Sequence, residues 1–430
     1  MPTRRNFLKN SFVTAAALSA AASTHAADGQ KITLGVIGPG GMGSNHLKLL
    51  SARKDVEIAY VCDVDAVKVA SAAKIVETGM GQAPKAVKDM RAIFDDKKVD
   101  AVFIATPDHW HAPATLLALD AGKHVYVEKP CSHNIREGRL MIEAQKKTGK
   151  VLQVGTQSRS TSTVIEAIDR LKAGDIGEIL AVKAWNSQKR ANIGFAKGMK
   201  APETLDFDLW CGPAPLVEYR TNLLPGRWRW FHAFGSGDIA NDGVHDIDVA
   251  LWGLGVTTHP NRIACLAGKY FFNDDQEWPD TQYAVFEYDI EGKKKQLTFE
   301  QRIWSPYVQE GYENGCAWYG TNGYLVCGHG EGWKLYGPKN KLIAEKEGKA
   351  DLGAHHNNFL ACIRGEVKQP NGNIQAGHLA ATICHLANIG HLTGRTLSFD
   401  PVSETFLNDK EATARVKRTY REHWATPKGV

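Results

Sequence analysis

The chain has 430 residues, of which 43% are hydrophobic and 23% are charged, and its formal net charge is +5. This length accommodates two domains with well-buried cores, and the composition is that of an ordinary globular protein. The lysines are scattered rather than striped, which argues against a nucleic-acid partner. No stretch approaches the ~20 apolar residues of a transmembrane helix, which argues against stable membrane insertion.

The N-terminus has the features of an export signal. Arg4 and Arg5 precede an Ala-rich apolar run over residues 12–22 and small residues up to Ala26. This pattern is typical of a twin-arginine signal, through which the Tat machinery exports proteins that have already folded. We therefore expect a signal peptide over residues 1–27, a periplasmic location and a mature charge near +2. An unprocessed signal would instead tether the protein to the membrane.

Residues 30–157 alternate short β-rich runs with helix-length segments, which predicts βαβ units and a doubly wound parallel sheet of the Rossmann type. The expected strands cover residues 32–37, 56–62, 101–105, 124–127 and 151–154, and the expected helices include residues 42–52 and 112–121.

The pattern changes after a helix expected at residues 163–173. Strands expected at residues 179–185, 262–270, 282–288, 295–304 and 323–327 predict a large, mostly antiparallel, open-faced sheet. Helices are expected to start near residue 246 and to cover residues 355–364 and 375–390. We assign residues 158–394 to this α+β domain, for substrate binding and oligomerisation, and residues 395–430 to a polar tail that packs back on the body.

A glycine-rich turn follows the first expected strand and opens a helix. Gly38, Gly40 and Gly43 form the dinucleotide fingerprint, and the turn also contains Gly41 and Met42. The glycines permit the tight turn, the approach of the pyrophosphate and close packing of helix on strand. Asp63 ends the next strand, 20 residues after Gly43, where an acid holds the ribose hydroxyls. With Asp65 it would repel a 2′-phosphate, so we predict NAD as the cofactor and NADP as the less favoured choice.

Two more strand ends face the same crevice, because ligands of such sheets bind outside the carboxyl ends of the strands. At the second of these strand ends, Lys129 would reach the nicotinamide end and hydrogen-bond a substrate hydroxyl. A surface ion pair between Lys129 and the preceding Glu128 is the simpler alternative. The residues that we expect at this end of the cofactor are Thr106, Pro107, His109, Glu128, Lys129 and Gln157.

The eight cysteines form no CxxC pair, and a protein that folds before export keeps most thiols reduced, so we favour free or buried thiols over one or two disulfides. Histidines recur at 109 and 111 and at 355 and 356, but further ligands at a recognisable spacing are lacking, and no metal site is predicted.

Together these motifs resemble the glucose–fructose oxidoreductase, inositol dehydrogenase and rhizopine-catabolism family (Gfo/Idh/MocA), in its exported branch. The resemblance also covers residues 154–157, 237–248, 394–395 and 420–424. It implies hydride transfer between a sugar or polyol carbon and the nicotinamide. It further implies a lysine, an aspartate and a histidine around the reacting hydroxyl, the aspartate four residues before the histidine.

Lys129 and His245 match that set, but Asn241 stands at the aspartate position. Asparagine can orient a hydroxyl but cannot take its proton. The catalytic candidates are therefore Lys129, His245, Asn241 and Asp242, with a buried core histidine as the alternative for His245. Candidates for contact with the substrate are Arg159, Trp185, Arg229 and Asp248, although aromatic side chains at this density also suit a core.

Three functions remain open at this point. The first is an exported oxidoreductase acting on a sugar, polyol or sugar derivative, with a tightly bound NAD because free cofactor is scarce outside the cytoplasm. The second is redox-neutral, NAD-dependent cleavage of a glycoside by transient oxidation and elimination. The third is a non-catalytic carbohydrate-binding protein. The open sheet face predicts a homodimer or homotetramer, with a monomer covered by its own tail as the alternative.

Overall fold

Six parallel strands form the first sheet, in the order β3-β2-β1-β4-β5-β6. The computed structural model describes residues 31–430, and its central strands are almost wholly buried, as expected for a parallel sheet covered on both faces. The strands are β1 (Ile32–Ile37), β2 (Val56–Cys62), β3 (Lys85–Val87), β4 (Ala101–Ile104), β5 (His124–Val127) and β6 (Leu152–Val154). The helices around them are α1 (Gly41–Ser51), α2 (Ala66–Met80), α3 (Arg91–Asp95), α4 (Asp108–Asp120) and α5 (Ile135–Thr148).

Ten strands form the second sheet, in the order β14-β13-β12-β11-β7-β10-β9-β8-β15-β16. Every neighbouring pair is antiparallel except β7 and β10, which run parallel. The strands are β7 (Ile179–Asn186), β8 (Arg262–Gly268), β9 (Thr281–Ile290), β10 (Lys293–Arg302), β11 (Asn314–Gly320), β12 (Tyr324–Gly328), β13 (Gly332–Gly337), β14 (Lys341–Glu347), β15 (Leu397–Asp400) and β16 (Thr405–Phe406).

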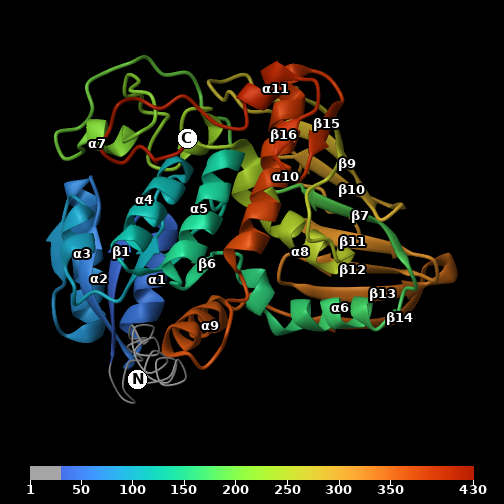
Figure 1. Ribbon diagram of the computed structural model, residues 1–430, viewed down its shortest axis with the longest axis horizontal. Coiled ribbons are helices and arrows are strands. Elements are labelled where there is room, and N and C mark those ends of the chain that lie inside the picture. Colours follow the sequence, from blue (N-terminus) through green and yellow to red (C-terminus); the bar gives the residue numbers. More distant parts are fainter. Residues whose placement is uncertain (1–30) are drawn as a thin grey trace, which may run out of the picture.

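Helices of the second domain cover one face of this sheet and fill the space beside the first domain. Figure 1 shows the first sheet with its helices on the left, the second sheet on the right, and α8 and α10 between them. The remaining helices of the chain are α6 (Ser162–Lys172), α7 (Phe207–Cys211), α8 (Val244–Leu254), α9 (Leu352–Arg364), α10 (Ile374–Thr393) and α11 (Lys410–Ala414), of which α6, α8 and α10 pack against this sheet. Phe359 and Leu360 of α9 pack into the core of the first domain, so the chain returns to the nucleotide side after the second sheet.

The fold class predicted from the sequence is confirmed, and the elements missed are those with weak patterns. Strands β11, β13 and β14 were not predicted, because glycines at or next to both ends make β11 and β13 look like turns, and β14 is an exposed edge strand without alternation in burial. Helix α4 begins four residues earlier than expected, at Asp108. Within the segment assigned to the tail, β15 pairs with β8 and buries Leu397 and Phe399.

Two further expectations concern the whole chain. All eight cysteines are free thiols, and seven of them are buried. No helix among residues 31–430 combines the length and the hydropathy that a membrane span needs. The predicted signal peptide lies outside the described residues.

Candidate active site

A cleft of about 610 Å³ opens at the carboxyl ends of the first sheet and extends to helix α8 of the second domain. It is the crevice in which a Rossmann-type sheet binds its ligand. Of the predicted site residues, those that line it are Gly38, Gly40, Gly41, Met42, Asp63, Thr106, Pro107, Glu128, Lys129, Gln157, Arg229, Asn241, Asp242 and His245.

The glycine-rich turn leaves room for a pyrophosphate. A Cβ on Gly40 or Gly41 would meet no protein atom within 4 Å, so these positions face the open cleft. Helix α1 starts here with no side-chain cap and no acid in its first turn, which leaves its first amides and its dipole for an anion. Gly43 does not line the cleft; its Cβ would lie 2.3 Å from the oxygen of Gly38, so it permits the packing of helix on turn. These residues fit a dinucleotide.

Asp63 directly follows strand β2 and lines the cleft. Its Oδ1 accepts a hydrogen bond from the amide of Asp65 (2.9 Å). Burial raises the pKa of Asp63 to about 6, so the side chain is ionised at neutral pH. A carboxylate in this place accepts hydrogen bonds from ribose hydroxyls and repels a 2′-phosphate.

The start of helix α4 places one predicted cofactor contact, His109, away from the cleft. His109 is fully buried and lies among aromatic rings, where its Nε2 donates to the oxygen of Trp210 (2.9 Å). It does not line the cleft; Trp110 and His111 do. His111 is held between the carbonyl oxygens of Thr106 (2.8 Å) and Pro130 (2.6 Å) and braces both strand ends. The first histidine of the pair therefore belongs to the core.

Glu128 and Lys129, which follow strand β5, face different partners: Glu128 contacts the first domain and Lys129 contacts the second. Glu128 accepts from His46 Nε2 (3.0 Å), and this bond holds the pKa of Glu128 below its usual value although burial alone would raise it. A Cβ on Gly155 would clash with the Glu128 carboxylate, so the glycine makes room for it. The neighbouring Lys129 ammonium donates to the backbone oxygen of Asn241 and faces the cleft.

The second domain meets Lys129 with a single turn of π-helix, η3 (Ile239–Gly243), directly before α8. Such turns recur at functional sites because they displace a helix from regular register. A Cβ on Gly243 would lie 2.6 Å from Phe299, so only glycine lets this turn approach the sheet.

Asn241 and Asp242 are both engaged by other side chains. Asn241 accepts from Arg229 Nε (2.6 Å) and donates to Asp238 (2.8 Å). Asp242 accepts from Arg190 Nη2 (2.9 Å), whose charge holds the pKa of Asp242 down against the effect of burial. Asn241 therefore holds Arg229 through its side chain and Lys129 through its backbone oxygen, whereas Asp242 is paired with Arg190.

Two histidines share the wall next to this turn. His245 at the start of α8 is buried, and its burial, together with the charge of Lys129, holds its pKa well below the usual value. It is therefore neutral at pH 7 and able to accept a proton. His329 lies with its ring 4.9 Å from that of His245, and it was not predicted from the sequence.

The structure places three of the predicted substrate contacts away from the cleft. Arg159 and Asp248 form a buried ion pair (2.7 Å) and neither lines the cleft. Trp185 is fully buried and donates to the oxygen of Tyr312, so it cannot stack on a sugar. The fourth candidate, Arg229, does line the cleft.

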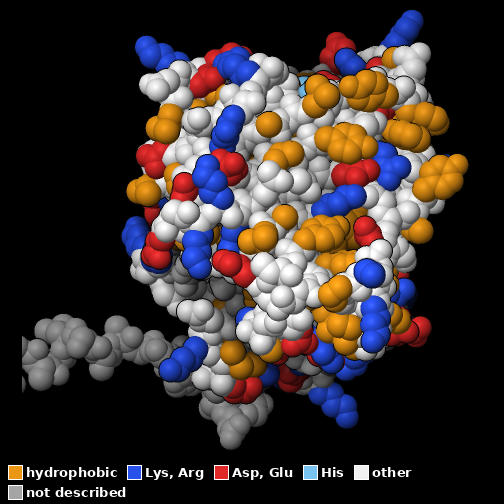
Figure 2. All heavy atoms as spheres, turned by 90° about the vertical axis from the view of Figure 1, so that its right-hand side faces the viewer, with side chains coloured by type: hydrophobic (Ala, Val, Ile, Leu, Met, Phe, Trp, Pro, Cys, Tyr) orange, Lys and Arg blue, Asp and Glu red, His pale blue; other side chains and the backbone are white. Residues whose placement is uncertain are grey.

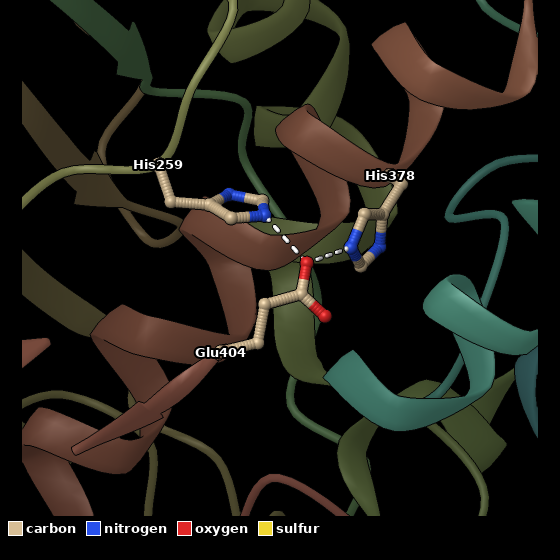
Figure 3. Close-up of side chains that lie close together, drawn as sticks. All are labelled: His259, His378 and Glu404. Atoms are coloured by element: carbon tan, nitrogen blue, oxygen red, sulfur yellow. Dashed lines mark hydrogen bonds and ion pairs between the residues drawn. The ribbon is translucent and has the colours of Figure 1, made fainter. Parts of the chain in front are cut away.

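Figure 3 shows a separate cluster formed by His259, His378 and Glu404, three side chains whose donor atoms lie close enough to hold a metal ion. Glu404 Oε1 accepts from His259 (2.9 Å), His378 (2.7 Å) and Arg139 (2.5 Å). These bonds hold the pKa of Glu404 well below its usual value although burial opposes this. The arginine already supplies the positive charge, so we interpret the cluster as a closed hydrogen-bond cage that joins α5, α10 and the turn between β15 and β16.

The fold and this cleft define a two-domain protein built to hold a dinucleotide against a small polar substrate. Comparison with known sequences places it further. The family models for an oxidoreductase family match the NAD-binding Rossmann fold at residues 32–156 and the C-terminal alpha/beta domain at residues 184–283 and 334–426. The chain belongs to the Gfo/Idh/MocA oxidoreductase family.

Individual curated relatives share 30% identity or less with this chain over the two matches that follow. Inositol 2-dehydrogenase 2 of Saccharopolyspora erythraea is 30% identical over 263 residues, 60% of this chain and 63% of the relative. A glycosyl hydrolase family 109 protein of Stenotrophomonas maltophilia is 27% identical over 236 residues, 54% of this chain and 50% of the relative. The chain thus spans about half the length of the curated relatives that it matches.

Solved structures share the fold. Levoglucosan dehydrogenase in complex with NADH and levoglucosan superposes with a TM-score of 0.65 at 18% identity, covering 86% of this chain and 99% of the other. Aldose–aldose oxidoreductase from Caulobacter crescentus, complexed with glycerol, gives 0.63 at 18% identity and covers 86% of this chain and all of the other.

Proposed function

We propose that this chain is an exported NAD-dependent oxidoreductase that transfers hydride between a sugar, polyol or sugar derivative and a cofactor that stays bound. The observation that carries the proposal is one cleft with a dinucleotide cradle at one end and Lys129 and His245 at the other. The sugar and polyol dehydrogenases among the relatives support the substrate class.

The nicotinamide, when bound, accepts or returns the hydride. His245 is neutral and takes the proton of the substrate hydroxyl, while the Lys129 ammonium, held by the Asn241 oxygen, stabilises the oxygen as it gives up that proton. Asn241, whose side chain is held by Arg229, positions the Lys129 ammonium through its backbone oxygen.

Export and cofactor retention belong together in this proposal. Arg4 and Arg5 lie in a signal-like segment, outside the described residues, that directs folded proteins to the Tat machinery. A periplasmic enzyme would lack a pool of free NAD, so it would carry its cofactor out and regenerate it on a second substrate.

The test is to purify the mature protein from the exported fraction, dialyse it exhaustively, denature it and quantify NAD, NADH, NADP and NADPH by mass spectrometry. We expect about one NAD or NADH for each chain. An empty protein that binds NAD weakly would refute retention, and the absence of the protein from the exported fraction would refute export.

A second candidate function is redox-neutral glycoside cleavage. Asn241 at the position of the usual aspartate and the similarity to a glycosyl hydrolase family 109 protein favour it. In that case nitrophenyl glycosides should release nitrophenol with no net change in NADH, and solvent deuterium should enter the sugar. A non-catalytic carbohydrate-binding protein would keep its binding in the Lys129→Ala and His245→Ala variants and show no turnover in the parent.

We also propose that two copies pair through the open face of the second sheet. Figure 2, which looks onto the right-hand side of Figure 1, shows apolar side chains gathered over part of that surface. The large apolar residues exposed by 48% to 75% on β8, β9 and the adjoining loops are Leu266, Tyr270, Phe271, Tyr283, Tyr307 and Val308. Light scattering should give a dimer or tetramer, and Leu266→Asp should dissociate it; a monomeric parent would refute the pairing.

A further inference from the structure

His329 occupies a rigid turn between β12 and β13. Its amide donates to the oxygen of Asn314 (3.1 Å). The glycines on either side allow close contacts: a Cβ on Gly328 would lie 2.4 Å from Tyr312, and one on Gly330 would lie 2.9 Å from Ala350. The turn is therefore packed against the domain, and it holds the imidazole at the wall of the cleft.

The surroundings of His329 make it a cation. Its Nδ1 hydrogen-bonds the buried carboxylate of Asp246 (3.2 Å). Although burial opposes the charge, Asp246, with a further contribution from Asp242, raises the pKa of His329 to about 9. Lys129 and His245 are the other titratable groups that face it, and Lys129 acts in the opposite direction. The imidazolium is thus the stable form at neutral pH.

Asp246 occupies only one of the two ring nitrogens. Among the described residues, none hydrogen-bonds Nε2 of His329, and the side chain keeps 24% of its surface exposed. Nε2 is therefore a charged donor available to a ligand in the cleft.

The proposed oxidation uses one proton acceptor, and His245 supplies it. His329 is a second histidine with its ring 4.9 Å away, and it is protonated where His245 is neutral. The proton transfer itself does not need it. The two oxygens of a vicinal diol lie within hydrogen-bond distance of each other, so neighbouring rings can each contact one of them. A neutral histidine then suits the hydroxyl that loses its proton, and a cationic one suits the oxygen beside it.

We propose that His329 contacts the substrate, donating from Nε2 to the oxygen on the carbon next to the oxidised one, so that the site selects vicinal diols. This rests on the proposed function in so far as it assigns the reacting hydroxyl to His245. The contact itself requires only that a polyol enters the cleft.

The test uses the holoprotein with two probes, myo-inositol, in which every hydroxyl has a neighbour, and cyclohexanol, which has a single one. His329→Phe keeps the ring and loses the donor, and we expect its kcat/KM for myo-inositol to fall about 10- to 100-fold, as for the loss of a charged hydrogen bond. Turnover of cyclohexanol should change far less than turnover of myo-inositol, and His329→Gln should recover part of the loss. His391→Gln, at a half-exposed histidine near the end of α10, is the matched control.

Histidine-ring NMR of the same holoprotein gives a readout without turnover. Addition of myo-inositol, and not of cyclohexanol, should shift the His329 ring signals, and Asp246→Asn should lower the pH at which that ring loses its proton. If the parent turns over myo-inositol and His329→Phe has the same kcat/KM for it, the contact is refuted and the proposed function stands. The same conclusion follows if His329→Phe lowers turnover of both probes by the same factor. If the parent turns over neither probe but the ring signal responds to myo-inositol alone, the contact stands and the oxidation fails. If neither probe shifts the His329 ring signals, the contact is refuted whatever the kinetics show.

Discussion

The two halves of the cleft are built in different ways. The nucleotide half comes from a continuous stretch of sequence in which strand ends deliver Gly38, Asp63 and Thr106 in turn. The substrate half brings together Lys129, His245 and His329, which come from a strand end of the first domain, a helix start and a turn of the second sheet. Binding of cofactor therefore depends on local backbone geometry, whereas catalysis depends on the docking of two domains.

The largest effect on activity is expected for Lys129, which lies where the two halves of the cleft meet. Lys129→Met should lower kcat by about 10²- to 10⁴-fold, the range for a lost proton-transfer or charge-stabilising group. The dinucleotide content for each chain should stay that of the parent, because the glycine turn does not use this side chain. Steady-state kinetics and mass spectrometry of the denatured protein check both parts; a decrease smaller than tenfold would remove Lys129 from the chemistry.

Two glycines of one turn separate binding from folding in the nucleotide half. Gly40→Ala adds a Cβ to the open cradle, so we expect NAD affinity to fall at least tenfold with little change in unfolding midpoint. Gly43→Ala places its Cβ 2.3 Å from the oxygen of Gly38 and should cost about 1–3 kcal/mol of unfolding free energy. Calorimetry and urea unfolding distinguish the two, and equal effects of both variants would contradict the assigned roles.

The different construction of the two halves explains which parts of the site could be predicted from the sequence. The turn at Gly38 and the acid at Asp63 are local patterns with a fixed spacing, so they predicted the nucleotide half. Trp185 and His109 were misplaced because burial against residues distant in sequence, such as Tyr312 and Trp210, leaves no local signal. His329 was missed for the same reason. A histidine between glycines was the available hint, but its partner Asp246 precedes it by 83 positions.

The cage at Glu404 tests how far the second domain depends on such distant contacts. Glu404→Gln leaves Arg139, His259 and His378 without a charged acceptor and should reduce the unfolding free energy by about 1–3 kcal/mol. Because the pKa of Glu404 is lowered in the folded protein, the stability that it provides is fully present above the carboxyl's unfolded pKa and is lost progressively as the pH falls from that value towards the lower folded pKa.

Urea unfolding of the parent and the variant between pH 3 and pH 7 measures both effects, and the difference between their unfolding free energies should narrow towards the acid end. EDTA should leave the parent's melting temperature unchanged, because Arg139 already neutralises the carboxylate. A melting temperature that falls with EDTA and returns with zinc would show a metal centre instead of a cage.

A smaller effect is expected for cofactor choice. Asp63→Asn removes the charge that opposes a 2′-phosphate, so the affinity for NADP relative to NAD should rise about tenfold. Since the pKa of Asp63 is raised to about 6, the parent itself should discriminate less as the pH falls below that value. Competitive binding of the two cofactors to stripped protein at pH 5.5 and 7.5 measures this; a ratio independent of pH would place the discrimination elsewhere.

The smallest effect tests whether the nucleotide half is as local as its motifs suggest. Trp424 lines the cleft from the far end of the chain, with its ring 5.8 Å from that of Trp110 and the Arg91 guanidinium 4.4 Å above it. Trp424→Ala removes this cation–π contact and part of the wall, so release of bound NAD should become about two- to fivefold faster. Stopped-flow displacement with excess labelled NAD measures the rate. An unchanged rate would mean that the C-terminal segment only lies beside the cleft, and that residues up to Gln157 retain the nucleotide unaided.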